Sequence, residues 1–291
     1  MQNNATPLQV FKTPEARARF LEAYQDVLRH WPVPYEELDV STSFGTTHLI
    51  ASGPVEAPPL FLLHCYFGTA TVWYPNVAGL SRKFRTYAVD VLGEPNKSQP
   101  VRQITNRAEL AQWFTGLLDA LHVDKAYMVG NSFGGFLTLN QAMHTPERLK
   151  GIVVISPAAS FAQIWPFYTH MFLPVLLGSE ARLRKALEWA SNGVALDDCW
   201  TTLFQIGLSE GKPVNMVFPI VFKQADLQRI QVPTWLLIGD HEVIYKPEAT
   251  IRKALRMMPN IKTGIIPQAN HIAAMANPEE INRRIIEAFS S

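Results

Sequence analysis

A short run of small residues between an apolar stretch and a helical pattern constrains the fold of this chain more than any other feature. Residues 130–135 read Gly-Asn-Ser-Phe-Gly-Gly, after the apolar residues 126–129 and before the helix-like residues 136–143. A strand, a G-x-S-x-G turn and a helix in this order predict a nucleophile elbow, whose central residue is strained and whose neighbours must be small. The elbow would expose the hydroxyl of Ser132 at the carboxyl end of a sheet, where open α/β sheets bind ligands.

Two other known types of glycine-rich turn also follow a strand, and residues 130–135 match neither of them. A dinucleotide-binding fold needs G-x-G-x-x-G at its first strand–helix turn. Here Ser132 occupies the second glycine position, and the motif lies in the middle of the chain. A phosphate-binding P-loop would end in Gly-Lys-Ser or Gly-Lys-Thr, which this motif lacks. The turn therefore favours nucleophilic chemistry at Ser132 over nucleotide binding.

Composition and charge narrow the class of protein. The chain has 291 residues, enough for one large α/β domain or two small ones, and its 47% hydrophobic and 18% charged residues are typical of a globular protein with a core. The net charge is +1 without a basic stripe, so neither nucleic acid nor an anionic membrane is an expected partner. Residues 1–7 are polar and unlike a signal peptide, no apolar run approaches bilayer length, and two cysteines make no disulfide framework. We therefore expect a cytoplasmic enzyme; the sequence carries no signal for an oligomeric state.

Strand and helix patterns alternate along most of the chain. Apolar runs typical of buried strands occur at residues 60–63, 86–89, 126–129, 152–155, 234–238 and 263–266, with a hairpin expected at 37–42 and 47–51. Helix patterns begin near Thr13-Pro14, near Asn106 with a capping-box-like Glu109, near residue 248 and near residue 278. This alternation predicts an α/β fold with a mostly parallel central sheet and helices on both faces.

One stretch interrupts the alternation. Residues 157–230 show no strand pattern and are rich in aromatic residues, and the stretch is too long for a plain loop. We predict that it forms a helical cap inserted over the carboxyl end of the sheet, between core segments 1–156 and 231–291. Most of its aromatic side chains would pack the cap onto the core, and some would supply an apolar pocket wall above Ser132.

A serine nucleophile needs a base within hydrogen-bond reach, and His271 is the strongest candidate. It follows the last predicted strand and precedes the last predicted helix, in a loop at the same end of the sheet as Ser132. Among the weaker candidates, His30, His122, His144 and His170 lie in or beside predicted helices, and His48 lies on an outer strand. We therefore expect His271 to act as the general base.

The imidazole in turn needs a carboxylate, and two acids compete for that role. Asp240 and Glu242 both follow the strand at 234–238 and precede His271, which satisfies the chain order Ser, acid, His. Asp240 has the commoner residue type, whereas Glu242 has the longer reach, and the residues alone leave both open. The sequence from His241 also begins like a zinc-protease helix, but Tyr245 stands where the second histidine would be. No metal is therefore expected.

The oxyanion of an acyl-transfer intermediate needs two backbone N–H donors. Phe133 directly follows the nucleophile, and its amide would lie at a helix N-terminus, where the dipole favours negative charge. The second donor should come from the loop after the strand at 60–63, and the N–H of Tyr66 is the candidate. The aromatic side chains of this loop would line the acyl pocket. This machinery needs no cofactor.

Taken together, these motifs resemble the α/β-hydrolase superfamily over nearly the whole chain, and within it the bacterial carboxylesterase-like hydrolases. The matching landmarks are residues 31–36, 45–48, 88–98, the elbow, and 239–245. The resemblance implies an acid three residues after Gly239, which points to Glu242. The sequence departs from the family at Cys65, which replaces the glycine of the usual His-Gly pair and could crowd the loop or act as a second thiol.

The resulting hypothesis is a cofactor-free serine hydrolase that cleaves a carboxylic ester of a small to medium apolar substrate through an acyl-enzyme. Ser132 would attack, His271 would transfer the proton, Glu242 would hold His271, and the amides of Tyr66 and Phe133 would stabilise the oxyanion. Two alternatives stay open. The same triad serves carbon–carbon bond hydrolysis, perhydrolysis or lyase chemistry on related folds, and the fold can also act as a non-catalytic binder of small ligands.

Overall fold

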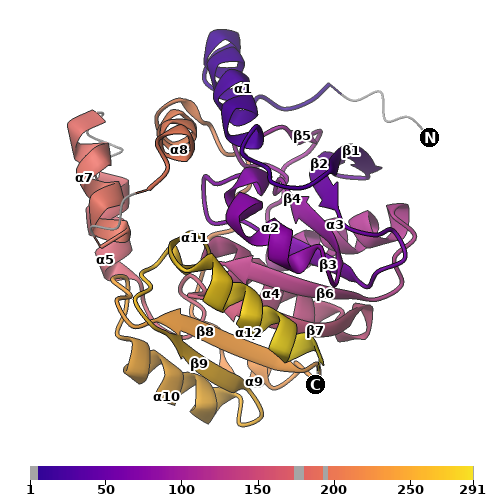
Figure 1. Ribbon diagram of the computed structural model, residues 1–291, viewed down its shortest axis with the longest axis vertical. Coiled ribbons are helices and arrows are strands. Elements are labelled where there is room, and N and C mark those ends of the chain that lie inside the picture. The colour runs from indigo at the N-terminus through magenta and orange to yellow at the C-terminus, as the bar shows by residue number, and fades with distance from the viewer. Residues whose placement is uncertain (1–5, 174–179, 193–195, 291) are drawn as a thin grey trace.

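A mostly parallel sheet forms the centre of the molecule (Figure 1). The computed structural model describes residues 6–173, 180–192 and 196–290. In spatial order the strands are β1 (Tyr35–Thr42), β2 (Gly45–Ser52), β4 (Arg85–Val89), β3 (Pro59–Leu63), β6 (Ala126–Asn131), β7 (Leu149–Ile155), β8 (Thr234–Gly239) and β9 (Lys262–Ile266), with β5 (Gln99–Pro100) paired to β2. The pairs β1–β2 and β2–β4 are antiparallel, and every pair from β4 to β9 along this order is parallel. This arrangement confirms the predicted fold class.

Helices cover both faces of the sheet, as the alternation of elements predicts. One face carries α2 (Tyr74–Leu80), α11 (Ala273–Ala276) and α12 (Pro278–Ser290), and the other carries α3 (Arg107–Ala120), α4 (Phe133–His144), α9 (Gln224–Leu227) and α10 (Pro247–Met257). Successive side chains of a strand point to opposite faces. In β3, Leu60 and Leu62 therefore join the first core, and Phe61 and Leu63 join the second.

Local sequence signals explain where two of the helices begin. Helix α1 (Pro14–Leu28) starts after Thr13, whose hydroxyl accepts the N–H of Ala16 at 3.1 Å. Helix α3 starts after Asn106, which accepts the N–H of Glu109 at 3.0 Å. The Glu109 carboxylate bonds the N–H of Thr105, one residue earlier than a capping box would place it.

Between β7 and β8 the described residues form helices and irregular segments and no strand. The elements are α5 (Trp165–Phe167), η3 (Tyr168–Phe172), α7 (Glu180–Ala190), α8 (Asp198–Glu210) and α9, while η1 (Ala70–Trp73) and η2 (Pro146–Arg148) lie elsewhere. Parts of the predicted cap, residues 174–179 and 193–195, lie outside the described residues. Figure 1 shows α8 beside α1, and the two helices pack together, so this segment contacts the N-terminal helix as well as the sheet edge. Within the described part of the chain, no helix is both long and apolar enough to cross a membrane.

The tight approach of α4 to the sheet gives a stability prediction. A Cβ on Gly134 would lie 2.2 Å from the backbone oxygen of Leu63, whereas the nearest atom to a Cβ on Gly116, in α3, is 3.8 Å away. We expect Gly134→Ala to lower the free energy of unfolding by about 3 kcal/mol because the strand must move. The matched change Gly116→Ala should keep it constant or raise it by up to about 1 kcal/mol, because alanine favours helix. Urea unfolding measures both, and equal effects would contradict the packing described here.

Candidate active site

Ser132 occupies a turn with no spare room between β6 and α4. Its backbone has φ +53° and ψ −111°, a conformation that residues with a side chain rarely adopt. Hydrogen bonds to the end of β7 and to the loop after it stabilise the turn: the N–H of Ser132 donates to Ile155 O at 2.9 Å, and its C=O accepts the N–H of Ala158 at 2.9 Å. A Cβ on Gly130 would lie 2.1 Å from Gly134 O, which explains the glycines of the motif. The predicted elbow geometry is therefore present at the carboxyl end of β6.

His271 reaches Ser132 from the segment after β9. Its Nε2 lies 3.0 Å from the Ser132 hydroxyl oxygen, and the imidazole is buried. The two residues are 139 positions apart in the chain and meet because β6 and β9 end at the same edge of the sheet. At this distance the imidazole can accept the hydroxyl proton.

Glu242 faces the other side of the imidazole. Both of its carboxylate oxygens lie 3.0 Å from Nδ1 of His271, and Oε1 also accepts the N–H of Val243 and Ile244 at 2.9 and 3.0 Å. Burial acts to raise the pKa of Glu242, but the facing His271, the Ser156 hydroxyl and the N–H of Ile244 outweigh it and hold the pKa below its usual value. Glu242 is therefore an anion at neutral pH, so Nδ1 carries the ring proton and Nε2 is left to accept one.

Asp240, the competing acid, has a different position. Its Oδ1 accepts the N–H of Ala269 at 3.1 Å and lies 3.2 Å from Nδ1 of His241, and its side chain is 37% exposed. The N–H of His241 also donates to Ala269 O at 2.9 Å. Asp240 thus joins the loop after β8 to the loop that carries His271, and the structure brings Glu242, not Asp240, to the imidazole.

The predicted oxyanion donors lie on two neighbouring elements. Phe133 begins α4, and Tyr66 lies in the oxyanion loop, residues 64–68, which follows β3. The rings of Tyr66 and Phe133 pack edge to face with centroids 4.9 Å apart. Burial raises the pKa of the Cys65 thiol to about 12, so the thiol stays protonated near neutral pH and does not compete as a nucleophile.

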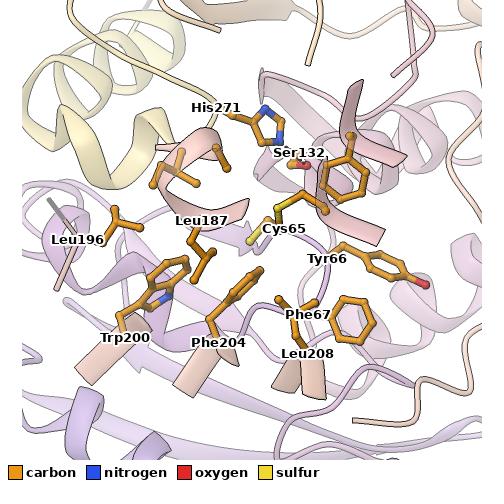
Figure 2. Close-up of a pocket in the computed structure, with 14 residues that line it drawn as sticks. Cys65, Tyr66, Phe67, Ser132, Leu187, Leu196, Trp200, Phe204, Leu208 and His271 are labelled. Carbon is orange, nitrogen blue, oxygen red and sulfur yellow. Dashed lines mark hydrogen bonds between the residues drawn. The ribbon is translucent and has the colours of Figure 1, made fainter. Parts of the chain in front are cut away.

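An apolar cavity opens beside Ser132 (Figure 2). It contains about 660 Å³ of empty space, part of it open to solvent, and Figure 2 shows Ser132 and His271 at one end and Trp200, Phe204 and Leu208 at the other. Its lining is Cys65, Tyr66, Phe67, Ser132, Phe167, Met171, Leu187, Ala190, Leu196, Trp200, Phe204, Leu208, His271 and Ile272. Apart from Ser132 and His271 the lining is apolar or aromatic. A smaller hollow of about 390 Å³ shares Tyr66, Ser132 and Phe167 with it.

Several lining residues come from the segment between β7 and β8. Trp200, Phe204 and Leu208 lie one helical turn apart on α8, and Leu187 lies on α7. Within the described ranges, no group of three or more His, Cys, Asp or Glu side chains could hold a metal ion. The short distance from Ser132 to His271 and the apolar lining beside them support nucleophilic attack by Ser132 on an apolar substrate.

The sequence interpretation missed Glu94. This residue follows Gly93 in the loop after β4, is fully buried, and accepts the N–H of Phe67 at 3.1 Å. The sequence predicts that Glu94 follows the strand that became β4. It does not predict that the side chain is buried next to the oxyanion loop, because no periodic pattern indicates this burial.

Comparisons with known proteins agree with this geometry. The sequence model of the alpha/beta hydrolase fold family matches residues 58–197. A protein of Bacillus subtilis named "Uncharacterized carboxylesterase nap" is 38% identical over 282 residues, which cover 94% of this chain and 93% of the relative. Carboxylesterase YbfK of the same organism is 36% identical over 286 residues, which cover 95% of each chain.

Solved structures give the same result. The crystal structure of naproxen esterase (carboxylesterase NP) from Bacillus subtilis superposes with a TM-score of 0.90 at 36% identity, covering 96% of this chain and 99% of the other. The crystal structure of carboxylesterase CesB (YbfK) from Bacillus subtilis gives 0.87 at 35% identity, covering 94% and 98%. Sequence, sheet order and elbow geometry together show that this chain belongs to the α/β-hydrolase fold family, among its bacterial carboxylesterase-like members.

Proposed function

We propose that this protein is a serine carboxylesterase that cleaves small to medium apolar esters. The observation that carries the proposal is the chain of hydrogen-bond distances from Ser132 through His271 to Glu242, at the end of an apolar cavity. The similar proteins of Bacillus subtilis bear the names carboxylesterase and naproxen esterase. These names support a carboxylic ester as the substrate class.

In the acylation step the Ser132 oxygen attacks the acyl carbon while its proton passes to Nε2 of His271. The imidazolium that forms lies against the Glu242 carboxylate, whose negative charge stabilises it. His271 then returns the proton to the leaving alkoxide, and the alcohol departs. A water molecule then attacks the acyl carbon of the acyl-enzyme, with His271 again as the base, and the carboxylic acid is released from Ser132.

The tetrahedral intermediates carry negative charge on the former carbonyl oxygen. The N–H of Phe133, at the start of α4, and the N–H of Tyr66 are assigned as its two donors. The helix dipole of α4 adds positive potential at the same place. Because the cavity lining is apolar, each donor acts in a medium of lower dielectric constant than bulk water.

The segment 157–230 is assigned as the cap of this enzyme, with residues 1–156 and 231–291 as the hydrolase core. Leu187, Trp200 and Phe204 from this segment line the cavity, which supports a role in substrate selection. Since neither the cavity nor the smaller hollow is lined by a charged side chain among the described residues, apolar groups on either side of the ester are favoured over charged ones.

Replacement of the nucleophile tests the proposal directly. Ser132→Ala should lower kcat on p-nitrophenyl esters by about 10⁴-fold or more, because only substrate binding and the oxyanion donors remain. Initial rates on a panel from acetate to laurate, with wild type and variant compared, measure this loss and the preferred chain length. Circular dichroism controls for folding. Equal turnover by both proteins, or none by the wild type, would contradict the proposed ester hydrolysis.

The two acids give a second, paired test. Glu242→Gln should lower kcat by roughly 10³- to 10⁴-fold, because an amide neither fixes the productive tautomer of His271 nor offsets the imidazolium charge. Asp240→Asn should keep kcat within about tenfold, because the amide oxygen can still accept the N–H of Ala269. Steady-state kinetics on one p-nitrophenyl ester decide between them, and the reverse ranking would assign the acid to Asp240.

A further inference from the structure

A buried carboxyl group without a part in the mechanism above lies against the oxyanion loop. Glu94 has no exposed surface, and its Oε2 accepts the N–H of Phe67 at 3.1 Å. Its other oxygen, Oε1, is buried and has no hydrogen-bond partner among the described residues. Burying a carboxyl group with an unpaired oxygen is unfavourable, so a residue in this state calls for a specific explanation.

Glu94 contacts the residue of the oxyanion loop whose backbone has a positive φ. Phe67 has φ +56°, in the left-handed region that residues with a side chain rarely occupy. A backbone stays in such a conformation only when its surroundings hold it there. The bond from the Phe67 N–H to Glu94 provides such a hold, because it fixes the plane of the peptide between Tyr66 and Phe67.

The preceding peptide, which contains the N–H of Tyr66, is fixed through its carbonyl group. Cys65 O accepts hydrogen bonds from Nδ1 of His64 at 2.7 Å and from the N–H of Gly68 at 2.9 Å. In a trans peptide the C=O and N–H groups point in opposite directions. The N–H of Tyr66 therefore points away from these two donors, and its direction depends on both neighbouring peptides staying in place.

The loop after β4 supplies the frame for this arrangement. Nε2 of His64 accepts the N–H of Val91 at 2.9 Å, which leaves the ring proton on Nδ1 for Cys65 O. Burial lowers the pKa of His64, which keeps the ring neutral. The same loop reaches the oxyanion loop a second time through Glu94. His64 thus holds the start of the oxyanion loop, and Glu94 holds its strained end.

We propose that Glu94 is a positioning residue for the oxyanion hole: its carboxyl oxygen holds the Tyr66–Phe67 peptide so that the Tyr66 N–H faces the oxyanion, and its charge limits how much negative charge the hole accepts. This inference rests on the proposed esterase function. It predicts that the oxygen of Glu94 helps the reaction, whereas a negative charge on Glu94 opposes it.

The effect of charge follows from the groups that face Glu94. Burial raises the pKa of Cys65 and of Tyr66, and a negative charge on Glu94 raises both further, so this charge disfavours a second negative charge on the loop. The segment packed over Gly93 presents Val214 and Asn215, neither of which titrates. Burial raises the pKa of Glu94 itself to about 7 against the lowering effect of the Phe67 N–H, so its charge changes near neutral pH.

Two substitutions separate the oxygen from the charge. Glu94→Leu removes the acceptor and should lower kcat on p-nitrophenyl butyrate roughly 10- to 100-fold with KM nearly constant, because the donor is misplaced for the transition state only. Glu94→Gln keeps an acceptor oxygen and should hold kcat within about threefold at about pH 6. A Gln variant as slow as the Leu variant, or a Leu variant as fast as the wild type, would overturn the proposal.

Asp90→Asn is the matched control on the same loop. Asp90 accepts the N–H of Ala70 at 2.7 Å and that of Lys97 at 3.2 Å, and neither residue adjoins Tyr66. The amide can keep only one of these bonds, so this variant should melt at a lower temperature with kcat within about threefold of wild type. A loss of kcat equal to that of Glu94→Leu would mean that loosening of the loop in general, rather than Glu94, controls the rate.

The pH dependence gives a readout that does not require the Leu variant to fold. The ratio of kcat for Glu94→Gln to kcat for wild type should rise at least about threefold between about pH 6 and pH 8, because only the wild type gains a charge beside the oxyanion. Taking this ratio cancels any pH dependence of kcat that both proteins share. A ratio that is constant or falls with pH would overturn the role of the charge.

Thermal stability checks the same ionisation independently of activity. The folded-state pKa of about 7 exceeds the value of about 4.3 for an unfolded glutamate. The folded state therefore binds more protons between these values, and the stability contributed by Glu94 falls as pH rises through this window. The melting temperature of Glu94→Gln relative to wild type should rise over the same window, and the opposite trend would mean that the carboxylate stabilises the fold.

These arms separate failure of the inference from failure of the proposed function. A wild type without Ser132-dependent turnover contradicts the esterase function. If the wild type is active but Glu94→Leu and Glu94→Gln have equal kcat, the proposed role of Glu94 is contradicted, whereas the esterase function is not. Phenylboronic acid, which forms a tetrahedral adduct with an active serine, should bind the Leu variant about tenfold more weakly than the Gln variant, and equal inhibition constants would overturn the inference.

Discussion

The rest of the site depends on the strained backbone of Ser132. The chain changes from strand to helix at this residue, and α4 therefore comes so close to β6 and β3 that neither Gly130 nor Gly134 has room for a Cβ. Packing on both sides enforces the conformation and offsets its cost. The consequence is chemical as well as structural. The same turn that lifts the hydroxyl of Ser132 above the sheet also opens a helix with the N–H of Phe133.

The partners of Ser132 come from separate strand ends that the parallel sheet brings to one edge. Within this edge the loop after β8 and the loop after β9 are joined to each other by Asp240 and His241, which both bond Ala269. Glu242 and His271 are therefore carried by a pair of loops that are linked through their backbones. A hydrogen bond between two such loops is less sensitive to local fluctuation than one between two independent loops.

Much of the fold follows from local patterns. Alternating apolar runs and helix starts predicted the parallel sheet and its two covered faces, and G-x-S-x-G predicted the turn at Ser132. The choice between Asp240 and Glu242 could not be derived from the residues themselves, because chain position does not say which carboxylate turns toward an imidazole 29 residues away. The position of Glu94 could not be predicted for a related reason. Its burial and its hydrogen bond to Phe67 depend on the tertiary structure and produce no periodic pattern in the sequence.

The helical segment between β7 and β8 is inserted between two strands of the core, which allows enzymes of this kind to diversify. The segment leaves the sheet after β7 and returns at β8, and these two strands are hydrogen-bonded neighbours in the register Ile152 to Thr234. Because the two strands are parallel, the segment starts at the carboxyl end of β7 and must cross one face of the sheet, where α9 packs against α4, to reach the amino end of β8. The core alone therefore fixes both of its ends. Helices can be lengthened, shortened or exchanged between those ends at a modest loop-closure cost without moving Ser132, His271 or Glu242. Substrate preference can then change by replacing one contiguous stretch of chain, while the residues that perform the chemistry stay as they are.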